Sequence, residues 1–195
     1  LERARISGEG DWINFRSDIH MALAMSVLPR PALFLDRDGV LNADKGYVAH
    51  PRDFEWMPGA KACVRRFNEL GYLVIVVTNQ TGVAYGLYSE TDIAAVHAFM
   101  LRELEAAGGR IDRIYECCWH PAATLAEYRC DSDHRKPRPG MLLQAMADFP
   151  IDRSRSLLIG DKQSDLEAAA AAGVRGFLYS GGDLLDFAQL AAASL

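Results

Sequence analysis

The segment Ala32-Leu33-Phe34-Leu35-Asp36-Arg37-Asp38-Gly39 places a short apolar run directly before two acidic residues and a glycine. An apolar run of this length that ends at polar residues is typical of a strand buried on both faces of a sheet. Aspartate and glycine are both common in the turns that follow strands. The segment therefore predicts a buried strand whose carboxyl end presents Asp36 and Asp38.

Similar apolar runs recur along the chain and alternate with segments of helical pattern. Strands are predicted at 72–77, 114–118, 156–159 and, as a fifth, 177–179. Helices are predicted at 58–70, from a cap at Ser89 to a stop at Gly108, at 141–149, from a capping box of Ser164 and Glu167 to Gly173, and at 184–193.

This alternation of strands and helices predicts an α/β fold with a mainly parallel sheet and right-handed crossovers. In such a sheet the carboxyl ends of the strands emerge at one edge, where ligands bind. The polar residues that follow four of the predicted strands should therefore meet: Asp36 to Gly39, Thr78 to Gly82, the Cys/His loop that leads to Arg135 and Lys136, and Gly160 to Asp165.

The composition is that of an ordinary globular protein. The chain has 195 residues, of which 50% are hydrophobic and 24% charged, which excludes a disordered or fibrous protein. The length suits about one domain. The net charge of −5, together with the lack of a lysine or arginine run, argues against a nucleic-acid partner. An anionic ligand would have to meet a local cationic site.

The cysteines and apolar runs bear on compartment and domain organisation. A chain long enough to bury its own core needs no disulfide framework, so its four cysteines should be thiols or metal ligands. The apolar runs at 21–28 and 73–77 are much shorter than the ~20 residues of a membrane-spanning helix. Acidic residues precede the first run, which is unlike a signal peptide. We expect a cytoplasmic protein with a non-catalytic extension at 1–25 and a single domain at 26–195.

The predicted edge of the sheet gathers several carboxylates. Asp36, Asp38, Asp161 and in addition Asp165 could share one pocket, and charges of one sign that close need compensation. A divalent cation provides it, and Mg²⁺ prefers hard oxygen ligands while leaving positions for a substrate phosphate. The acidic cluster therefore predicts a Mg²⁺ site and phosphoryl chemistry.

Neighbouring donors support the same chemistry. The hydroxyl of Thr78, the amide of Asn79 and the ammonium group of Lys136 suit the equatorial oxygens of a transferring phosphoryl group. Asp36 could be the nucleophile that forms an aspartyl phosphate. Asp38 would then protonate the leaving oxygen and later deprotonate water.

Each of these residues also has an ordinary structural interpretation. An isolated Asp-x-Asp-Gly is usually a turn, and it is the ordered set of motifs that favours catalysis. Lys162 could be a solvated surface charge or the partner that holds Asp36. Asp165 could belong to the outer shell of the metal or simply begin a helix, where acidic residues answer the helix dipole.

From Asp36-Arg37-Asp38-Gly39 through Thr78-Asn79-Gln80 to Lys136 and Gly160-Asp161, the chain resembles the haloacid dehalogenase (HAD) superfamily of phosphatases over about 32–179. The resemblance implies a Rossmann-like three-layer sandwich without a large cap domain. It implies Asp36 as nucleophile, Asp38 as acid and base, and Thr78 and Lys136 on the phosphoryl group. Asp36, Asp161 and the main-chain carbonyl of Asp38 would bind Mg²⁺.

The resemblance also implies a set of substrate contacts and a substrate class. Within the superfamily, the motifs look like those of the histidinol-phosphatase-like group that includes the heptose 1,7-bisphosphate 7-phosphatases. We expect a sugar phosphate as substrate, with histidinol phosphate as the alternative. The expected substrate-binding residues are Arg37, Asp44, Lys45, Gly46, Tyr47, Asn79, Gln80, Thr81 and Arg135.

Another class of protein shares clustered acids, a hydroxyl and a lysine on an α/β sheet, namely the signalling receiver domain. In a receiver the phospho-acceptor follows a middle strand, whereas here that strand ends in Thr78-Asn79. We therefore favour an enzyme. We expect it to act as a monomer on a small molecule, without a nucleic-acid or membrane partner.

The loop before Arg135 is a candidate zinc site. Relatives carry Cys-x-His and then Cys-x-Cys directly before Arg-Lys, a pattern typical of structural zinc. This chain departs from both pairs. Cys118-Trp119-His120 supplies the first pair, but Pro121 follows His120 at once, so Cys117 and Trp119 compete for its register, while Ser132 and His134 occupy the second pair. The loop could be without metal, with both adjacent cysteines as ordinary buried residues. The alternative is a zinc shell of Cys118, His120, Cys130 and His134.

Overall fold

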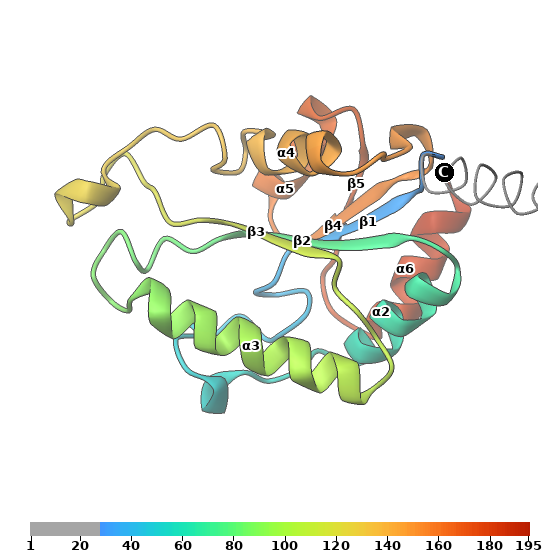
Figure 1. The fold of residues 1–195 in the computed structure, drawn as a ribbon, viewed down its shortest axis with the longest axis horizontal. Helices are drawn as coiled ribbons and strands as arrows, with labels where there is room; N and C mark the ends of the chain where they lie inside the picture. The colour runs from blue at the N-terminus through green and yellow to red at the C-terminus, as the bar shows by residue number, and fades with distance from the viewer. Residues whose placement is uncertain (1–27) are drawn as a thin grey trace, which may run out of the picture.

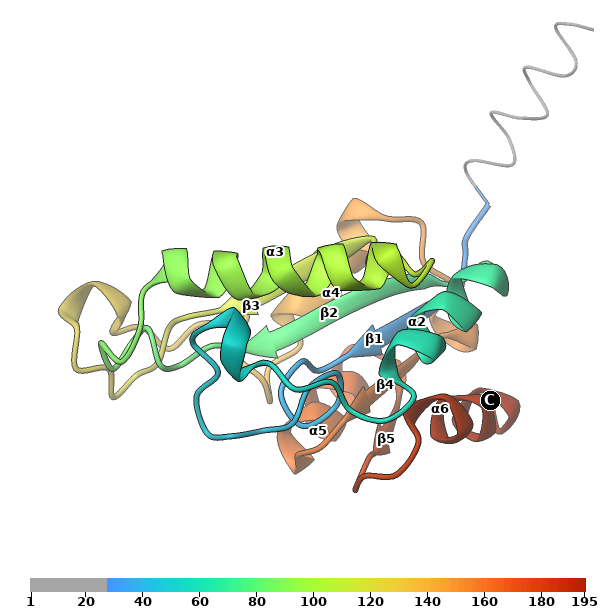
Figure 2. The same cartoon turned by 90° about the horizontal axis from the view of Figure 1, so that it is seen from below.

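A parallel sheet forms the centre of the computed structural model, which describes residues 28–195 (Figures 1 and 2). The predicted extension at 1–25 lies outside the described residues. The strand order is β3-β2-β1-β4-β5, with every pair parallel. The strands are β1 (Ala32–Leu35), β2 (Leu73–Asn79), β3 (Arg113–Cys117), β4 (Leu157–Gly160) and β5 (Arg175–Leu178).

Helices cover both faces of this sheet, which confirms the predicted three-layer α/β fold (Figure 1). One face is covered by α2 (Ala60–Glu69), α3 (Glu90–Ala106) and α6 (Leu184–Ala193). The other is covered by α4 (Gly140–Asp148) and α5 (Gln163–Ala171). Short 3-10 helices lie at η1 (Pro51–Asp53), η2 (Ala126–Tyr128) and η3 (Arg153–Arg155).

The central strand shows how the sequence divides the core. All four side chains of β1 are fully buried. Because successive side chains of a strand point to opposite faces, Leu33 and Leu35 pack against α2, α3 and α6, whereas Ala32 and Phe34 pack against α4 and α5. The same alternation continues beyond the strand, so that Asp36 and Arg37 face opposite sides of the sheet.

Most element boundaries shift by one to three residues from those predicted, and two of these differences concern the edge of the sheet. β2 continues through Thr78 and Asn79, so these residues belong to the strand rather than to the loop after it. The predicted capping box of Ser164 and Glu167 is wrong, because α5 begins at Gln163. Instead, the carboxylate of Asp165 accepts a hydrogen bond from the backbone N–H of Lys162 at 3.0 Å.

Among the described residues, no helix is long and apolar enough to cross a membrane.

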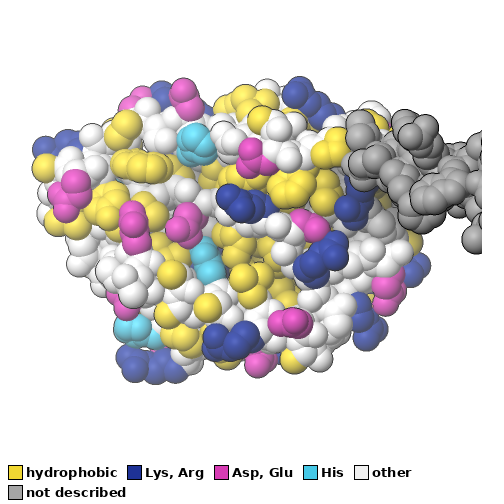
Figure 3. Space-filling model, in the orientation of Figure 1, with side chains coloured by type: hydrophobic (Ala, Val, Ile, Leu, Met, Phe, Trp, Pro, Cys, Tyr) yellow, Lys and Arg dark blue, Asp and Glu magenta, His cyan; other side chains and the backbone are white. Residues whose placement is uncertain are grey.

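On the face shown in Figure 3, basic and acidic side chains are interspersed with one another.

Candidate active site

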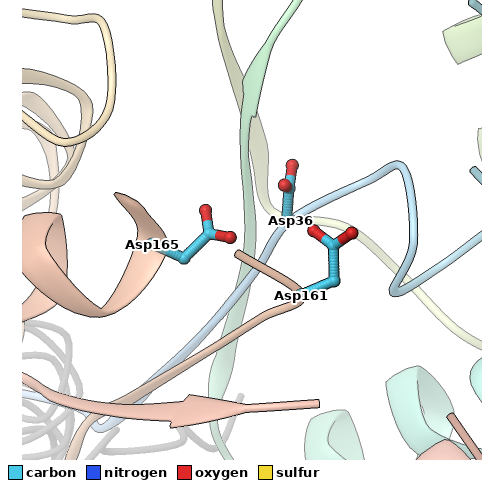
Figure 4. Close-up of side chains that lie close together, drawn as sticks. All are labelled: Asp36, Asp161 and Asp165. Atoms are coloured by element: carbon cyan, nitrogen blue, oxygen red, sulfur yellow. The ribbon is translucent and has the colours of Figure 1, made fainter. Parts of the chain in front are cut away.

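Carboxylates from three segments meet at the carboxyl edge of the sheet. Asp36 follows β1 and Asp161 follows β4, which is the neighbour of β1, so the parallel topology brings both to the same edge. Asp165 reaches the same point from the first turn of α5 (Figure 4). One oxygen of each carboxylate lies within 4.8 Å of the others.

Lys136 supplies the buried positive charge of this cluster. Its Nζ lies 3.0 Å from Asp36 Oδ2 and 2.5 Å from Asp165 Oδ1, and it donates to the carbonyl of Val77 at 2.8 Å. The side chain is almost fully buried. Lys136, and not Lys162, is therefore the partner of Asp36. Lys162 is half exposed and pairs with Asp44 at 3.0 Å.

Burial shifts the protonation of these groups. Burial raises the pKa of Asp36 to about 6, the attraction of Lys136 opposes the shift, and the charge of Asp165 adds to it. Burial likewise raises the pKa of Asp161, against the attraction of Lys162. Although burial alone would lower the pKa of Lys136, the charges of Asp36 and Asp165 raise it. The cluster thus carries more negative charge than its lysines compensate.

The cluster fits a divalent cation. Among the described residues, the buried Oδ1 of Asp161 has no hydrogen-bond partner. Gly39, with φ +85°, lies so close that a Cβ there would be 2.3 Å from Asp161 Oδ2. Asp165, by contrast, already serves Lys136 and the first turn of α5. Asp36 is engaged in the same way, by Lys136 and by the N–H of Arg37, so Asp36, Asp161 and Asp165 all lie close enough to share the ion.

Asp38 is surrounded by hydrogen-bond donors. Arg37 donates to both of its carboxylate oxygens, Asn42 Nδ2 donates to Oδ1 at 2.9 Å, and Gln80 Nε2 donates to Oδ2 at 3.0 Å. Arg37 is fully buried and does not line the pocket. The expectation that Arg37 contacts the substrate therefore does not agree with its position.

Two other predicted contacts hold the site together. Gln80 is buried, donates to Thr78 Oγ1 at 2.9 Å and accepts from the hydroxyl of Tyr88 at 3.0 Å. Asn79 exchanges hydrogen bonds with the backbone of Lys136 at 3.0 and 3.1 Å. The Thr-Asn-Gln motif thus positions Thr78 and Lys136 toward the carboxylates.

A pocket of about 600 Å³ opens at this edge of the sheet. Of the predicted site residues, it is lined by Asp36, Asp38, Asp44, Gly46, Tyr47, Thr78, Asn79, Thr81, Arg135 and Lys136. The predicted contact Lys45 does not line it and pairs with Glu55 at 3.0 Å. Arg135 donates to Thr81 Oγ1 at 2.7 Å, which holds its guanidinium at the pocket wall.

Two aromatic residues of the pocket, Tyr85 and Tyr88, were not predicted as substrate contacts. Tyr85 and Tyr88 line the pocket, and Tyr47 packs edge to face with Tyr88 at 6.1 Å between ring centroids. The only sequence signal for Tyr85 and Tyr88 is that they follow the Thr-Asn-Gln motif closely. The loop after β2 therefore shapes the pocket as well as supplying Thr81.

The predicted zinc ligands do not come together. Within residues 28–195, Cys118, His120, Cys130 and His134 do not form a metal-ligating cluster. Cys118 packs against Val83 and Ile93, and Cys130 is exposed. His120 lines the pocket, with its Nδ1 accepting from the N–H of Ala122 at 3.0 Å. The geometry does not fit a zinc ion in this loop.

Comparisons with known proteins show what the chain is similar to. The family model of HAD-hydrolase-like proteins matches residues 134–189. A D-glycero-beta-D-manno-heptose-1,7-bisphosphate 7-phosphatase from Rhodopseudomonas palustris is 49% identical over 160 residues, which cover 82% of this chain and 89% of the relative. The phosphatase of the same name from Escherichia coli K12 is 41% identical over 144 residues, 74% of this chain and 75% of the relative.

Solved structures give the same result. A D,D-heptose 1,7-bisphosphate phosphatase from B. bronchiseptica, in complex with magnesium and phosphate, superimposes with a TM-score of 0.69 at 33% identity and covers 82% of this chain and 86% of its own. A HAD-like phosphatase from Mesorhizobium loti superimposes with a TM-score of 0.75 at 37% identity, over 80% of this chain and 75% of its own. The chain therefore belongs to the HAD-like phosphatases and is a phosphomonoesterase.

Proposed function

We propose that this protein hydrolyses the 7-phosphate of D-glycero-D-manno-heptose 1,7-bisphosphate through an aspartyl-phosphate intermediate. The observation that carries the proposal is the combination, in one pocket, of a buried Asp36 held by Lys136 with a second cationic group at Arg135. A bisphosphate needs both, because one phosphate reacts while the other is bound. The planar guanidinium of Arg135 suits the phosphate that does not react.

The proposed reaction has two steps. First, Asp36 attacks the phosphorus, the bond from phosphorus to the sugar oxygen breaks, and Asp38 gives its proton to that oxygen. Second, water attacks the phosphorus of the aspartyl phosphate while Asp38 takes a proton from the water. The bond to Asp36 then breaks, which releases phosphate and restores both aspartates.

Thr78 and Lys136 line the same pocket as Asp36, where they can donate hydrogen bonds to the phosphoryl oxygens. Asp36, Asp161 and the main-chain carbonyl of Asp38 would hold Mg²⁺. The ion supplies positive charge that compensates the carboxylates and the phosphoryl oxygens. The unpaired buried oxygen of Asp161 supports this assignment within the described residues.

The substrate is tested by comparing kcat/KM for both anomers of heptose 1,7-bisphosphate, for histidinol phosphate and for simple sugar phosphates. The heptose bisphosphate should be preferred, and ³¹P NMR should show loss of the 7-phosphate. A clear preference for histidinol phosphate would contradict the substrate but not the mechanism.

The mechanism is tested with Asp36→Asn, which removes the nucleophile and should abolish turnover. Ample turnover by this variant would overturn the assignment. Activity should also disappear when the metal is removed with a chelator and return when Mg²⁺ is added. Both activities should be measured on the same sample of enzyme.

A further inference from the structure

Arg37 has no part in the reaction steps above, yet it is fully buried next to Asp38. Its Nη2 lies 2.8 Å from Asp38 Oδ2 and 3.0 Å from Oδ1, and its Nε lies 3.2 Å from Oδ1. A buried arginine needs partners for its remaining donors as well, because an unpaired buried charge is costly. The third guanidinium nitrogen shows where these partners are.

That nitrogen, Arg37 Nη1, lies 3.3 Å from His97 Nε2. Because a guanidinium group has only donors, Nε2 must be the acceptor, and the imidazole proton must be on Nδ1. His97 Nδ1 in turn lies 3.2 Å from Glu116 Oε2, where that proton is donated. The hydrogen bonds thus run in one direction, from Arg37 to His97 and from His97 to Glu116.

This chain of side chains links the catalytic loop to two rigid elements. His97 belongs to the buried face of α3, and Glu116 belongs to β3, the strand at the edge of the sheet. The side chain of Arg37 is 0% exposed and that of Asp38 is 18% exposed, so solvent screens their ion pair little. The Asp38 carboxylate is held from three sides, by Arg37, Asn42 and Gln80.

We propose that Arg37 is a positioning residue for Asp38, and that His97 and Glu116 fix Arg37 for this task. When Asp38 gives its proton to the leaving sugar oxygen, it becomes a carboxylate, and Arg37 compensates the charge that appears. The same contacts hold that carboxylate in place to take a proton from water in the second step. The inference rests on the proposed function, because it assigns a role within the two-step reaction.

The test uses substrates that differ in their need for a proton donor. The oxygen of a sugar phosphate leaves as an alcohol and needs the proton of Asp38, whereas p-nitrophenolate is a good leaving group and does not. We expect Arg37→Met to lower kcat on the sugar phosphate by about 100-fold or more, with KM changed much less.

With p-nitrophenyl phosphate, Arg37→Met should instead release a burst of about one p-nitrophenolate per active site before slow turnover, because only the second step still depends on Asp38. Equal losses on both substrates without a burst, in a variant whose circular dichroism and thermal unfolding match the parent, would overturn the proposal.

A matched pair at position 97 covers the case in which Arg37→Met does not fold. The amide of His97→Gln can still accept from Arg37 and donate to Glu116, whereas His97→Leu can do neither. We expect His97→Gln to stay near the parent, and His97→Leu to lose kcat on the sugar phosphate and to show the burst with p-nitrophenyl phosphate. Equal kcat values for the two variants would contradict the proposal. Turnover by Asp36→Asn would instead show that the two-step mechanism itself is wrong.

Discussion

Lys136 is the residue on which the electrostatics of the site depend. It is the buried counter-charge of both Asp36 and Asp165. Removing one partner of a buried ion pair leaves an uncompensated charge and typically costs about 3–5 kcal/mol. We therefore predict that Lys136→Met loses activity and about 3–5 kcal/mol of unfolding free energy, measured by urea denaturation at neutral pH.

Lys162→Met is the control for this prediction. Lys162 pairs with Asp44 and Asp161, but its side chain is 57% exposed, so solvent weakens both pairs. Its loss should cost about 1 kcal/mol or less. If the two lysine variants were equally stable, burial would not be what makes Lys136 important.

Asp152 offers a test of pH dependence away from the catalytic carboxylates. Its carboxylate accepts hydrogen bonds from the hydroxyl and N–H of Ser154 and from Arg155, which lower its pKa to about 2. A lowered folded-state pKa stabilises the fold above the unfolded value of 3.8, and this stabilisation is lost as the pH falls toward about 2.

We therefore predict that Asp152→Asn is less stable than the parent at neutral pH, and that the difference shrinks as the pH falls from about 4 to about 2. Urea denaturation of both proteins across this range checks it. A difference that stays constant with pH would show that the carboxylate charge contributes nothing.

At the scale of elements, the turn after β1 depends on Gly39. Gly39 and Gly71 have nearly the same φ, +85° and +83°. A Cβ at Gly39 would be 2.3 Å from Asp161 Oδ2, whereas a Cβ at Gly71 would meet nothing within 4 Å. The two positions therefore separate backbone strain from displacement of Asp161.

We predict that Gly71→Ala costs about 1–2 kcal/mol of stability through strain alone and leaves activity intact. Gly39→Ala should bear the same strain but also displace Asp161, and so lose Mg²⁺ affinity by calorimetry together with kcat. Normal Mg²⁺ affinity in Gly39→Ala would contradict the assigned role of Asp161.

The sequence predicted the elements well because the apolar runs of the strands are short and clearly bounded. It also predicted that Asp36, Thr78 and Lys136 meet. Parallel topology brings Asp36 and Thr78 to one edge of the sheet, and the hydrogen bonds of Asn79 to the backbone of Lys136 hold the lysine there. It misplaced Arg37, which the resemblance implied as a substrate contact. Side chains alternate along a strand, so Arg37 continues the face of Leu33 and Leu35 toward α3 and away from the pocket.

Whether the loop after β3 binds zinc could not be predicted from the presence of cysteine and histidine residues alone. Competent residue types were present at 118, 120, 130 and 134, but their directions depend on the local backbone. Cys118 turns into a small apolar cluster, and His120 turns into the pocket. The spacing of these residues in the sequence does not show in which direction either side chain points.

We predict that the purified protein contains far less than one zinc per chain, as measured by elemental analysis, and that a zinc chelator leaves its thermal unfolding unchanged. One zinc per chain in the parent protein, absent from Cys130→Ser, would instead support the predicted zinc ligands.

At the scale of the whole molecule, the described residues 28–195 contain three core clusters and the pocket of the candidate site. The start of this region is tied to the rest by Arg30, whose N–H donates to the carbonyl of Pro150 and whose carbonyl accepts from Asp152, both at 2.8 Å. Its guanidinium also donates to the carbonyls of Gly71 and Tyr72. We therefore propose that residues 26–195 are the phosphatase domain.

A chain that starts at residue 26 should accordingly keep its kcat/KM and its urea midpoint, because it retains Arg30 and all of β1. A chain that starts at residue 33 is the control, because it loses the Arg30 contacts and the first residue of the central strand, whose backbone pairs with both β2 and β4. Since the central strand connects the two halves of the sheet, the shorter chain should fail to fold. Equal stability of the two chains would show that Arg30 does not set the boundary of the domain, and loss of activity in the longer one would place part of the catalytic unit before residue 26.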